Sequence, residues 1–99
     1  TLTQVSDVRF KKNIQPLNHS LEKITQLNGY SYNWKDEQRN KDLQTGVLAQ
    51  EVQLIYPNLV KTDINGNLSV NYIGLIPVLL EAVKELKKEI DELKKEKSK

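Results

Sequence analysis

The sequence predicts an α+β fold in which short helices and β-hairpins precede one long C-terminal helix. Two patterns in its 99 residues indicate this order. Residues 30–72 contain short runs of β-forming side chains separated by turn residues, which is typical of hairpins. From Ile76 onward, apolar side chains recur at steps of three and four residues, which is typical of an amphipathic helix. The length and the 28% of charged residues fit a single domain.

The first quarter of the chain predicts one strand and one short helix. Apolar and basic side chains alternate in Val8–Lys11, which predicts a short strand or extended segment. Ser20 has a side chain that can cap a helix over the following residues, and Asn28-Gly29 would end that helix. His19 is expected to be a loop residue just before the helix.

The next segment predicts a strand, a loop and a second helix. Tyr30–Trp34 alternates aromatic and small polar side chains, as a strand with one buried face does. Lys35–Thr45 is polar without a period and is expected to be an exposed loop. Gly46–Pro57 begins as an apolar strand, then acquires helical spacing until Pro57 stops it.

A second hairpin is expected around Asn65-Gly66. This pair stands between Leu59–Ile64 and Leu68–Tyr72, two runs rich in β-forming residues. Because Asn and Gly tolerate positive φ, the pair predicts a type I′ turn between two antiparallel strands.

The C-terminal helix carries a strict heptad pattern. Position a falls at residues 76, 83 and 90 and position d at residues 79, 86 and 93, so Ile76–Lys95 would span about 30 Å of helix. Isoleucine or valine at a with leucine at d favours a dimer, and Glu89 with Lys94 favours parallel chains. Pro77 requires the helix to start nearby, at residues 71–76, or to bend. The alternative is a helix that packs only on its own domain.

Composition argues against several kinds of site. There is no cysteine and only His19 as histidine, so no disulfide, metal site or other cofactor is predicted. The 15 basic and 13 acidic residues give a net charge of +2, which provides no electrostatic reason to expect a nucleic-acid partner. No apolar run approaches the roughly 20 residues of a membrane span, and no signal peptide is visible, so no membrane contact is expected.

Ser6 with Lys11 is the main candidate pair for catalysis, and Ser6 with Lys12 is a weaker one. A serine hydroxyl becomes a nucleophile when a base takes its proton, and a lysine can be that base when its ammonium loses its proton readily. In a straight strand Ser6 and Lys11 would point to opposite faces, because five is an odd offset. The pair therefore needs a bend after Ser6, or a lysine from a neighbouring chain. Gln50 and Glu51 of "AQEV" are a weaker candidate, since an acidic residue also suits the first turn of a helix.

Four motifs together resemble a known family. "SDVRFKKNI" is similar to the S-D-x-R-x-K-x-x-I signature of the intramolecular chaperone auto-processing domain of phage tail spikes, tail fibres and neck appendages. "LEKITQLNGYSYNW" resembles its helix and aromatic strand, "GVLAQEVQLIYPNLV" its G-x-x-A-Q-E-V segment, and "VNYIGLIPVLLEAVKELK" the start of its terminal helix. The likeness covers residues 6 to 90 in order and spacing.

The resemblance implies a homotrimer, against the dimer that the heptad side chains favour. It implies that residues 1–5 end an upstream β-helical fibre of the same polypeptide, that residues 6–75 are the chaperone and auto-processing region, and that residues 76–99 are a trimerising helix with a charged tail. Such a domain assists folding of the fibre and then cuts itself off. It would do so during virion assembly in the host cytoplasm, leaving the mature tail.

The resemblance also assigns the site residues. Ser6 matches the nucleophile and Lys11 the general base, while Asp7 and Arg9 match supporting positions that shape the loop and tune the lysine. The implied cleavage site lies beside Ser6, between Ser6 and Asp7. A serine that attacks its own carbonyl closes a strained four-membered ring, so attack on the carbonyl before Ser6 and attack by a serine of another chain stay open.

The two exposed loops have an expected role, and two alternative functions stay open. Lys35–Thr45 and the Asn65-Gly66 hairpin are candidate protrusions that hold the end of the fibre. A purely structural trimeriser that never cleaves is one alternative function. A self-cleaving trimeric domain of a membrane-bound transcription factor is another. A nucleotide link proposed for some appendage members has no phosphate-binding loop to support it here.

Overall fold

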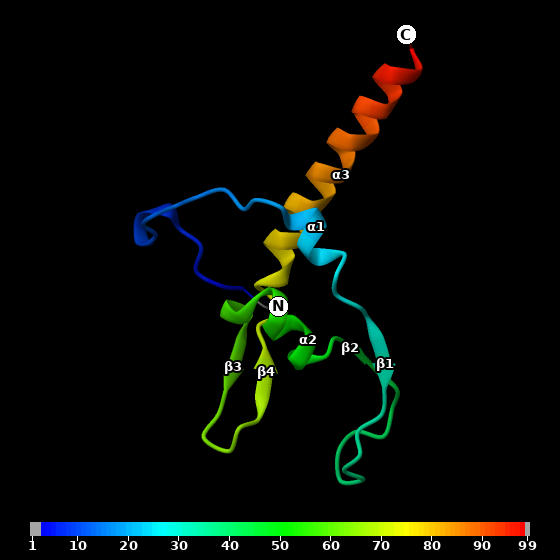
Figure 1. Ribbon diagram of the computed structural model, residues 1–99. Helices are drawn as coiled ribbons and strands as arrows, with labels where there is room; N and C mark the ends of the chain where they lie inside the picture. The colour runs from blue at the N-terminus through cyan, green and yellow to red at the C-terminus, as the bar shows by residue number, and fades with distance from the viewer. Residues whose placement is uncertain (1–2, 99) are drawn as a thin grey trace.

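The long C-terminal helix α3, Leu75–Lys97, is the axis along which the other elements are arranged (Figure 1). The structure is a computed structural model that describes residues 3–98. Thr1 and Leu2 of the predicted fibre end, and Lys99 of the charged tail, lie outside the described residues. The predicted α+β order is confirmed, with two small hairpins before the long helix.

Short elements precede α3 in this order: the 3₁₀ helix η1, Val8–Phe10; helix α1, Ser20–Ile24; strands β1, Tyr30–Tyr32, and β2, Gln44–Gly46; helix α2, Ala49–Ile55; the 3₁₀ helix η2, Pro57–Leu59; and strands β3, Val60–Thr62, and β4, Leu68–Val70. Strands β1 and β2 form one antiparallel pair, and β3 and β4 form another. Both hairpins point away from the C-terminal end of α3 (Figure 1).

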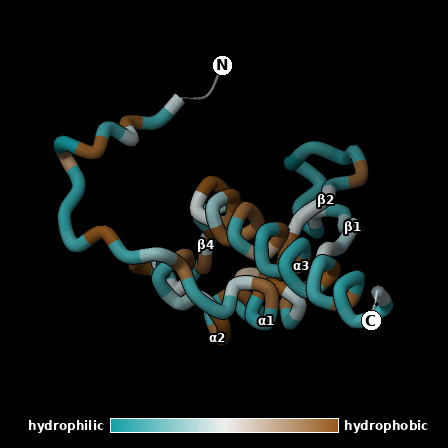
Figure 2. Tube along the Cα trace, turned by 90° about the horizontal axis from the view of Figure 1, so that it is seen from above, coloured by the Kyte–Doolittle hydropathy of each residue, from teal (hydrophilic) through white to brown (hydrophobic). Residues whose placement is uncertain are grey.

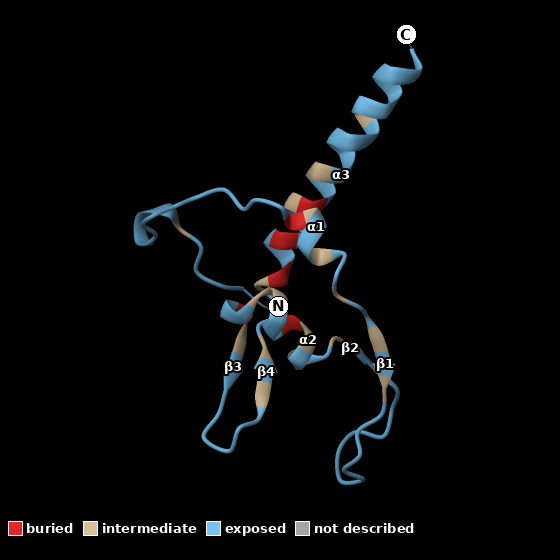
Figure 3. Ribbon diagram, in the orientation of Figure 1, coloured by how far each residue is buried: buried red, intermediate tan, exposed pale blue. Residues whose placement is uncertain are grey.

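The core is small and lies where α2, η2 and the first turn of α3 meet. Val52, Leu59 and Leu75 are its buried residues, and partly buried side chains from α1, α2 and both hairpins surround them. Figure 3 shows buried residues gathered in this region, whereas the outer half of α3 and the N-terminal segment are exposed. No helix among residues 3–98 is long and apolar enough to cross a membrane.

Helix α3 has two apolar faces, one buried and one exposed. Leu75, Val78 and Ala82 are buried at steps of three and four residues, and they form the face that packs on the rest of the chain. Glu85 continues this face, and its carboxylate accepts a hydrogen bond from the Leu21 backbone N–H at 2.7 Å. This contact satisfies one of the free N–H groups at the start of α1. Pro77 is the third residue of α3, where no hydrogen-bonded N–H is needed.

The heptad residues form a separate face of α3. All six are at least 44% exposed: Ile76, Leu79, Val83, Leu86, Ile90 and Leu93. The residues that pack α3 on its own domain are therefore different from those that form the heptad pattern. We call the six heptad residues the seam.

Three sequence predictions about local structure were wrong. Val8–Lys11 is not a strand, because the Asp7 carboxylate accepts the Arg9 N–H and starts a 3₁₀ turn instead. His19, at φ 58°, is the N-cap of α1, and Ser20 is its first residue with a buried side chain. The run Gly46–Pro57 was predicted to begin as a strand. Strand β2 instead ends at Gly46, and it includes the last polar residues of the predicted loop.

The Asn65-Gly66 hairpin is confirmed, but its turn is not of the predicted type and its strands are shorter than predicted. The Asp63 carboxylate accepts hydrogen bonds from the backbone N–H groups of Asn65 and Asn67, and these bonds lower the Asp63 pKa. Among the described residues, positive φ occurs at Gly66 but not at Asn65, which excludes a type I′ turn. The Asp63 N–H donates to the Asn67 carbonyl at 3.0 Å, so these two residues pair beyond the ends of the strands and enclose three residues, of which the last, Gly66, is left-handed.

Gly74, immediately before α3, lies against the core. A Cβ atom at this position would stand 2.5 Å from Leu59 Cδ2 and 3.0 Å from Asn71 Nδ2. We expect Gly74→Ala to lower the free energy of unfolding by about 1–3 kcal/mol, as overpacking does. Urea denaturation measures this loss. Gly29→Ala is the control, because a Cβ there meets nothing within 4 Å, and an equal loss in both variants would contradict the explanation.

Candidate active site

The candidate site lies in residues 3–18, a segment that precedes α1 and that we call the arm. The arm bends sharply after Ser6. Asp7 caps η1 through its side chain, the Phe10 N–H donates to the Asp7 carbonyl at 3.1 Å, and the Lys11 N–H donates to the Val8 carbonyl at 3.1 Å. This 3₁₀ turn folds the chain back on itself, so residues five apart can meet on one side.

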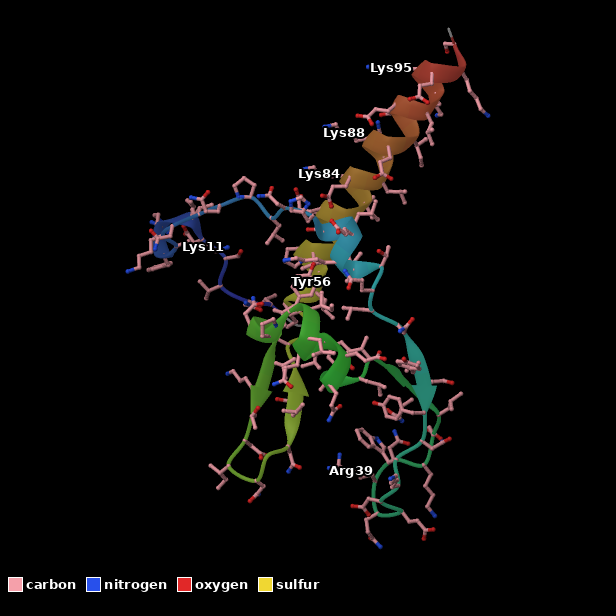
Figure 4. All side chains as sticks on the ribbon, in the orientation of Figure 1. Lys11, Arg39, Tyr56, Lys84, Lys88 and Lys95 are labelled. Atoms are coloured by element: carbon pink, nitrogen blue, oxygen red, sulfur yellow. The ribbon has the colours of Figure 1, made fainter. Side chains whose placement is uncertain are left out.

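Ser6 and Lys11 do meet across this turn. Lys11 Nζ donates a hydrogen bond to Ser6 Oγ at 2.7 Å, within the range required between a nucleophile and its base. Both side chains are exposed, and Figure 4 labels Lys11 on the arm, apart from the body of the chain. The bend that the sequence argument required is present within a single chain.

Asp7 and Arg9 form an ion pair on the same turn. Arg9 Nη2 lies 2.7 Å from Asp7 Oδ2, and Arg9 Nε donates to both carboxylate oxygens. The side-chain hydrogen bond from Arg9, followed by its backbone hydrogen bond, lowers the Asp7 pKa, and the same ion pair raises the Arg9 pKa. In the single chain Arg9 is thus directed to Asp7, which accounts for a role in shaping the turn. Its influence on Lys11 stays a prediction.

Apolar side chains flank the site without covering it. Val5, Val8 and Phe10 are each at least 66% exposed, although they stand next to the Ser6–Lys11 contact in sequence. A serine hydroxyl in open water is an ordinary surface group, because activation requires a base held in a shielded site. The geometry of a dyad is therefore present, and its shielding from water is not supplied by the described part of the same chain.

Glu51 supports the fold, and Gln50 is exposed and lines the groove described below. Both lie in the first turn of α2, and Tyr30 Oη donates to the Glu51 carboxylate oxygens at 3.0 and 2.9 Å. This hydrogen bond raises the Tyr30 pKa and ties β1 to α2. His19 is exposed, and its nearest charged partner is Glu22 at 3.7 Å.

Sequence reasoning missed a groove between the two hairpins. It has a volume of about 610 Å³ and is lined mainly by aromatic and aliphatic side chains from β1, the start of α2 and β4, among them Tyr32, Trp34, Leu48, Val70 and Tyr72. The alternating aromatic residues of β1 predicted one buried face. Only the tertiary structure shows that the two hairpins line a common groove. The Arg39 guanidinium lies over the Trp34 ring, 4.6 Å from its centroid.

Comparison with known proteins places this geometry in context. Residues 6–61 match the protein family described as "Chaperone of endosialidase" (Peptidase_S74). The chain is 41% identical over 87 residues to the long tail fiber protein Gp37 of Escherichia phage AR1, covering 81% of this chain and 8% of that protein. It is 35% identical over 94 residues to the Gp37 proteins of Enterobacteria phages K3 and T2, covering 89% of this chain and 8% and 7% of those proteins. The chain thus spans less than a tenth of the length of these relatives.

Proposed function

The chain belongs to the chaperone of endosialidase family, and we propose that it is the chaperone domain of a phage tail fibre, which trimerises the fibre and then releases itself by cleavage beside Ser6. The family match begins at Ser6, and the matched region makes up less than a tenth of the relative named as a long tail fiber protein. These two findings support a small domain that acts on a much longer polypeptide of which it is part.

The surface of the single chain supports assembly with further copies. It exposes 8909 Å², whereas a compact protein of this mass exposes roughly 5,800 Å². Its radius of gyration of 17.7 Å also exceeds the ~13 Å of a compact chain of this length. The excess of about 3,100 Å² is in the range that obligate subunits bury. The exposed seam of α3 supplies a face with the periodicity that packs helices around a common axis.

The contact between Ser6 and Lys11 is the observation that carries the cleavage proposal. With a neutral Lys11, the 2.7 Å contact reverses, so that Nζ accepts the proton of the Ser6 hydroxyl. Ser6 Oγ then attacks a peptide carbonyl beside it, a C–O bond forms, the C–N bond breaks, and the proton passes from the lysine to the departing amine. Water hydrolyses the resulting ester and regenerates the hydroxyl. Attack on the carbonyl of Val5 avoids the four-membered ring; the amine is then the Ser6 nitrogen itself, and the chain separates when water hydrolyses the ester.

The hairpin ends are the proposed contacts with the fibre. The loop between β1 and β2 and the loop between β3 and β4 extend at the same end of the molecule, opposite the C-terminal end of α3 (Figure 1). Their residues are mostly exposed and polar, which suits a contact that must be released after cleavage. The apolar groove between the hairpins offers a surface for the chain that they hold.

Expression of the whole fibre with and without this domain tests the chaperone role. We expect the complete polypeptide to yield folded trimers, and a polypeptide that ends before Ser6 to aggregate, because its chains are never brought into register. Size exclusion with mass measurement compares the trimer yields. Equal trimer yields from both polypeptides would contradict the chaperone role. Complete polypeptide that folds but stays uncut would favour the alternative of a structural trimeriser.

A further inference from the structure

The arm is an ordered element that the described part of its own chain leaves largely uncovered. Its hydrogen bonds, within residues 3–98, all run between arm residues. Its five large apolar side chains are 44–78% exposed: Val5, Val8, Phe10, Ile14 and Leu17. Burying an apolar side chain stabilises a protein. Five exposed apolar side chains along one short segment therefore indicate that a partner covers this segment.

The arm lies apart from the body of the chain and contains left-handed backbone. Asn13 and His19 have φ values of 55° and 58°, a region that non-glycine residues seldom adopt. One lies within the arm and the other joins it to α1. Figure 2 shows the arm standing clear of the packed elements when the molecule is viewed from above. The arm is therefore shaped to reach beyond its own subunit.

We infer that the arm docks on a second copy of this chain, with Phe10 as its main anchor. The inference deepens the proposed trimer and rests on it. The six aliphatic side chains of the seam are too few to account for the whole of the ~3,100 Å² surface excess, so further surface is expected to be covered elsewhere. Apart from the groove between the hairpins, which is proposed to hold the fibre, the arm carries the longest series of exposed apolar side chains before α3. Phe10 is the only phenylalanine, and aromatic anchors contribute most at interfaces.

Docking at Phe10 would also complete the site. Phe10 precedes Lys11 directly, and Val5 precedes Ser6, so a surface that covers these apolar neighbours displaces water from the catalytic pair. A second copy would then provide the enclosure that the single chain lacks, while both catalytic side chains stay in one arm.

Photocrosslinking in the whole fibre tests where the arm lies. A photoreactive benzoylphenylalanine replaces Phe10, and in a control it replaces Ile64, which is fully exposed at the tip of the β3–β4 hairpin. We expect Phe10 to give adducts of twice the chain mass on a denaturing gel, with mass spectrometry locating the bond in residues 19–98 of a second copy. Adducts within the same chain, adducts to fibre residues upstream of Thr1, or an equal yield of the same adducts from Ile64 would overturn the inference.

Limited trypsin digestion provides an independent measurement. If Phe10 anchors the arm, Phe10→Ser should make cutting after Lys11 and Lys12 about tenfold faster, while Ile64→Ser leaves the rate unchanged. Equal rates for wild type and Phe10→Ser would overturn the inference. The mass of the uncut assembly separates the two proposals: a monomer overturns both the trimer and the docked arm, whereas a trimer with Phe10 bonded only to its own chain overturns the arm alone.

Discussion

Ser6→Ala is expected to leave the whole fibre polypeptide uncut, with no C-terminal fragment after prolonged incubation. The change removes the oxygen that Lys11 contacts at 2.7 Å and with it the covalent route. Because Ser6 is exposed in the single chain and contacts no core residue, the variant should fold and assemble as the wild type does. Fragment masses followed over time measure the cleavage, and trimer yield shows that chaperoning is retained.

Lys11→Ala should slow cleavage by about 10²–10⁴-fold, the usual contribution of a general base. The chain offers a matched control in Lys12, the adjacent exposed lysine. Lys12→Ala is expected to cut at the wild-type rate. Equal cleavage rates in Lys11→Ala and Lys12→Ala would show that Lys11 is not the general base. Only the overall positive charge of the arm would then affect cleavage.

Leu86→Asp combined with Ile90→Asp is expected to dissociate the proposed trimer into single chains. Each chain would place two carboxylates in the seam, and desolvating unpaired charges costs several kcal/mol for each chain. Both residues are exposed in the single chain, so the variant should retain the helical content of the wild type. Sedimentation equilibrium measures the mass.

The matched control for the seam is Leu54→Asp. Leu54 is 83% exposed on α2 and lies outside the heptad pattern, so this variant should stay trimeric. A trimer that survives both seam substitutions would contradict the role of the seam, and a stable dimer of the wild type would favour the side-chain rule for two-stranded coils over the family resemblance.

Patterns that repeat over many residues of the sequence predicted the fold most reliably. The heptad from Ile76 to Leu93 predicted α3 because many side chains of one helix share the pattern, and a single local contact cannot override it. Short segments were less predictable. At Asp7 and Asp63 one carboxylate binds nearby backbone N–H groups, which replaced a strand by a 3₁₀ turn and a type I′ turn by a longer loop. Such competition leaves no periodic signal.

The candidate site was predictable in its residues but not in its setting. The odd offset between Ser6 and Lys11 required a bend, and η1 supplies one. The sequence could not indicate that the Asp7–Arg9 pair would hold this turn, or that the site would lie on an arm apart from the core. Whether a side chain of the arm or the seam is exposed depends on the elements that pack around it. That arrangement follows only from the three-dimensional structure.

The mass of the C-terminal fragment released by the wild-type fibre is the most direct test of self-cleavage. The account predicts one fragment that begins at Ser6 or at Asp7, and these two possibilities differ by a single serine residue. The same measurement on Ser6→Ala should find only the uncut chain. A fragment that begins elsewhere, or one that Ser6→Ala releases equally well, would contradict the account.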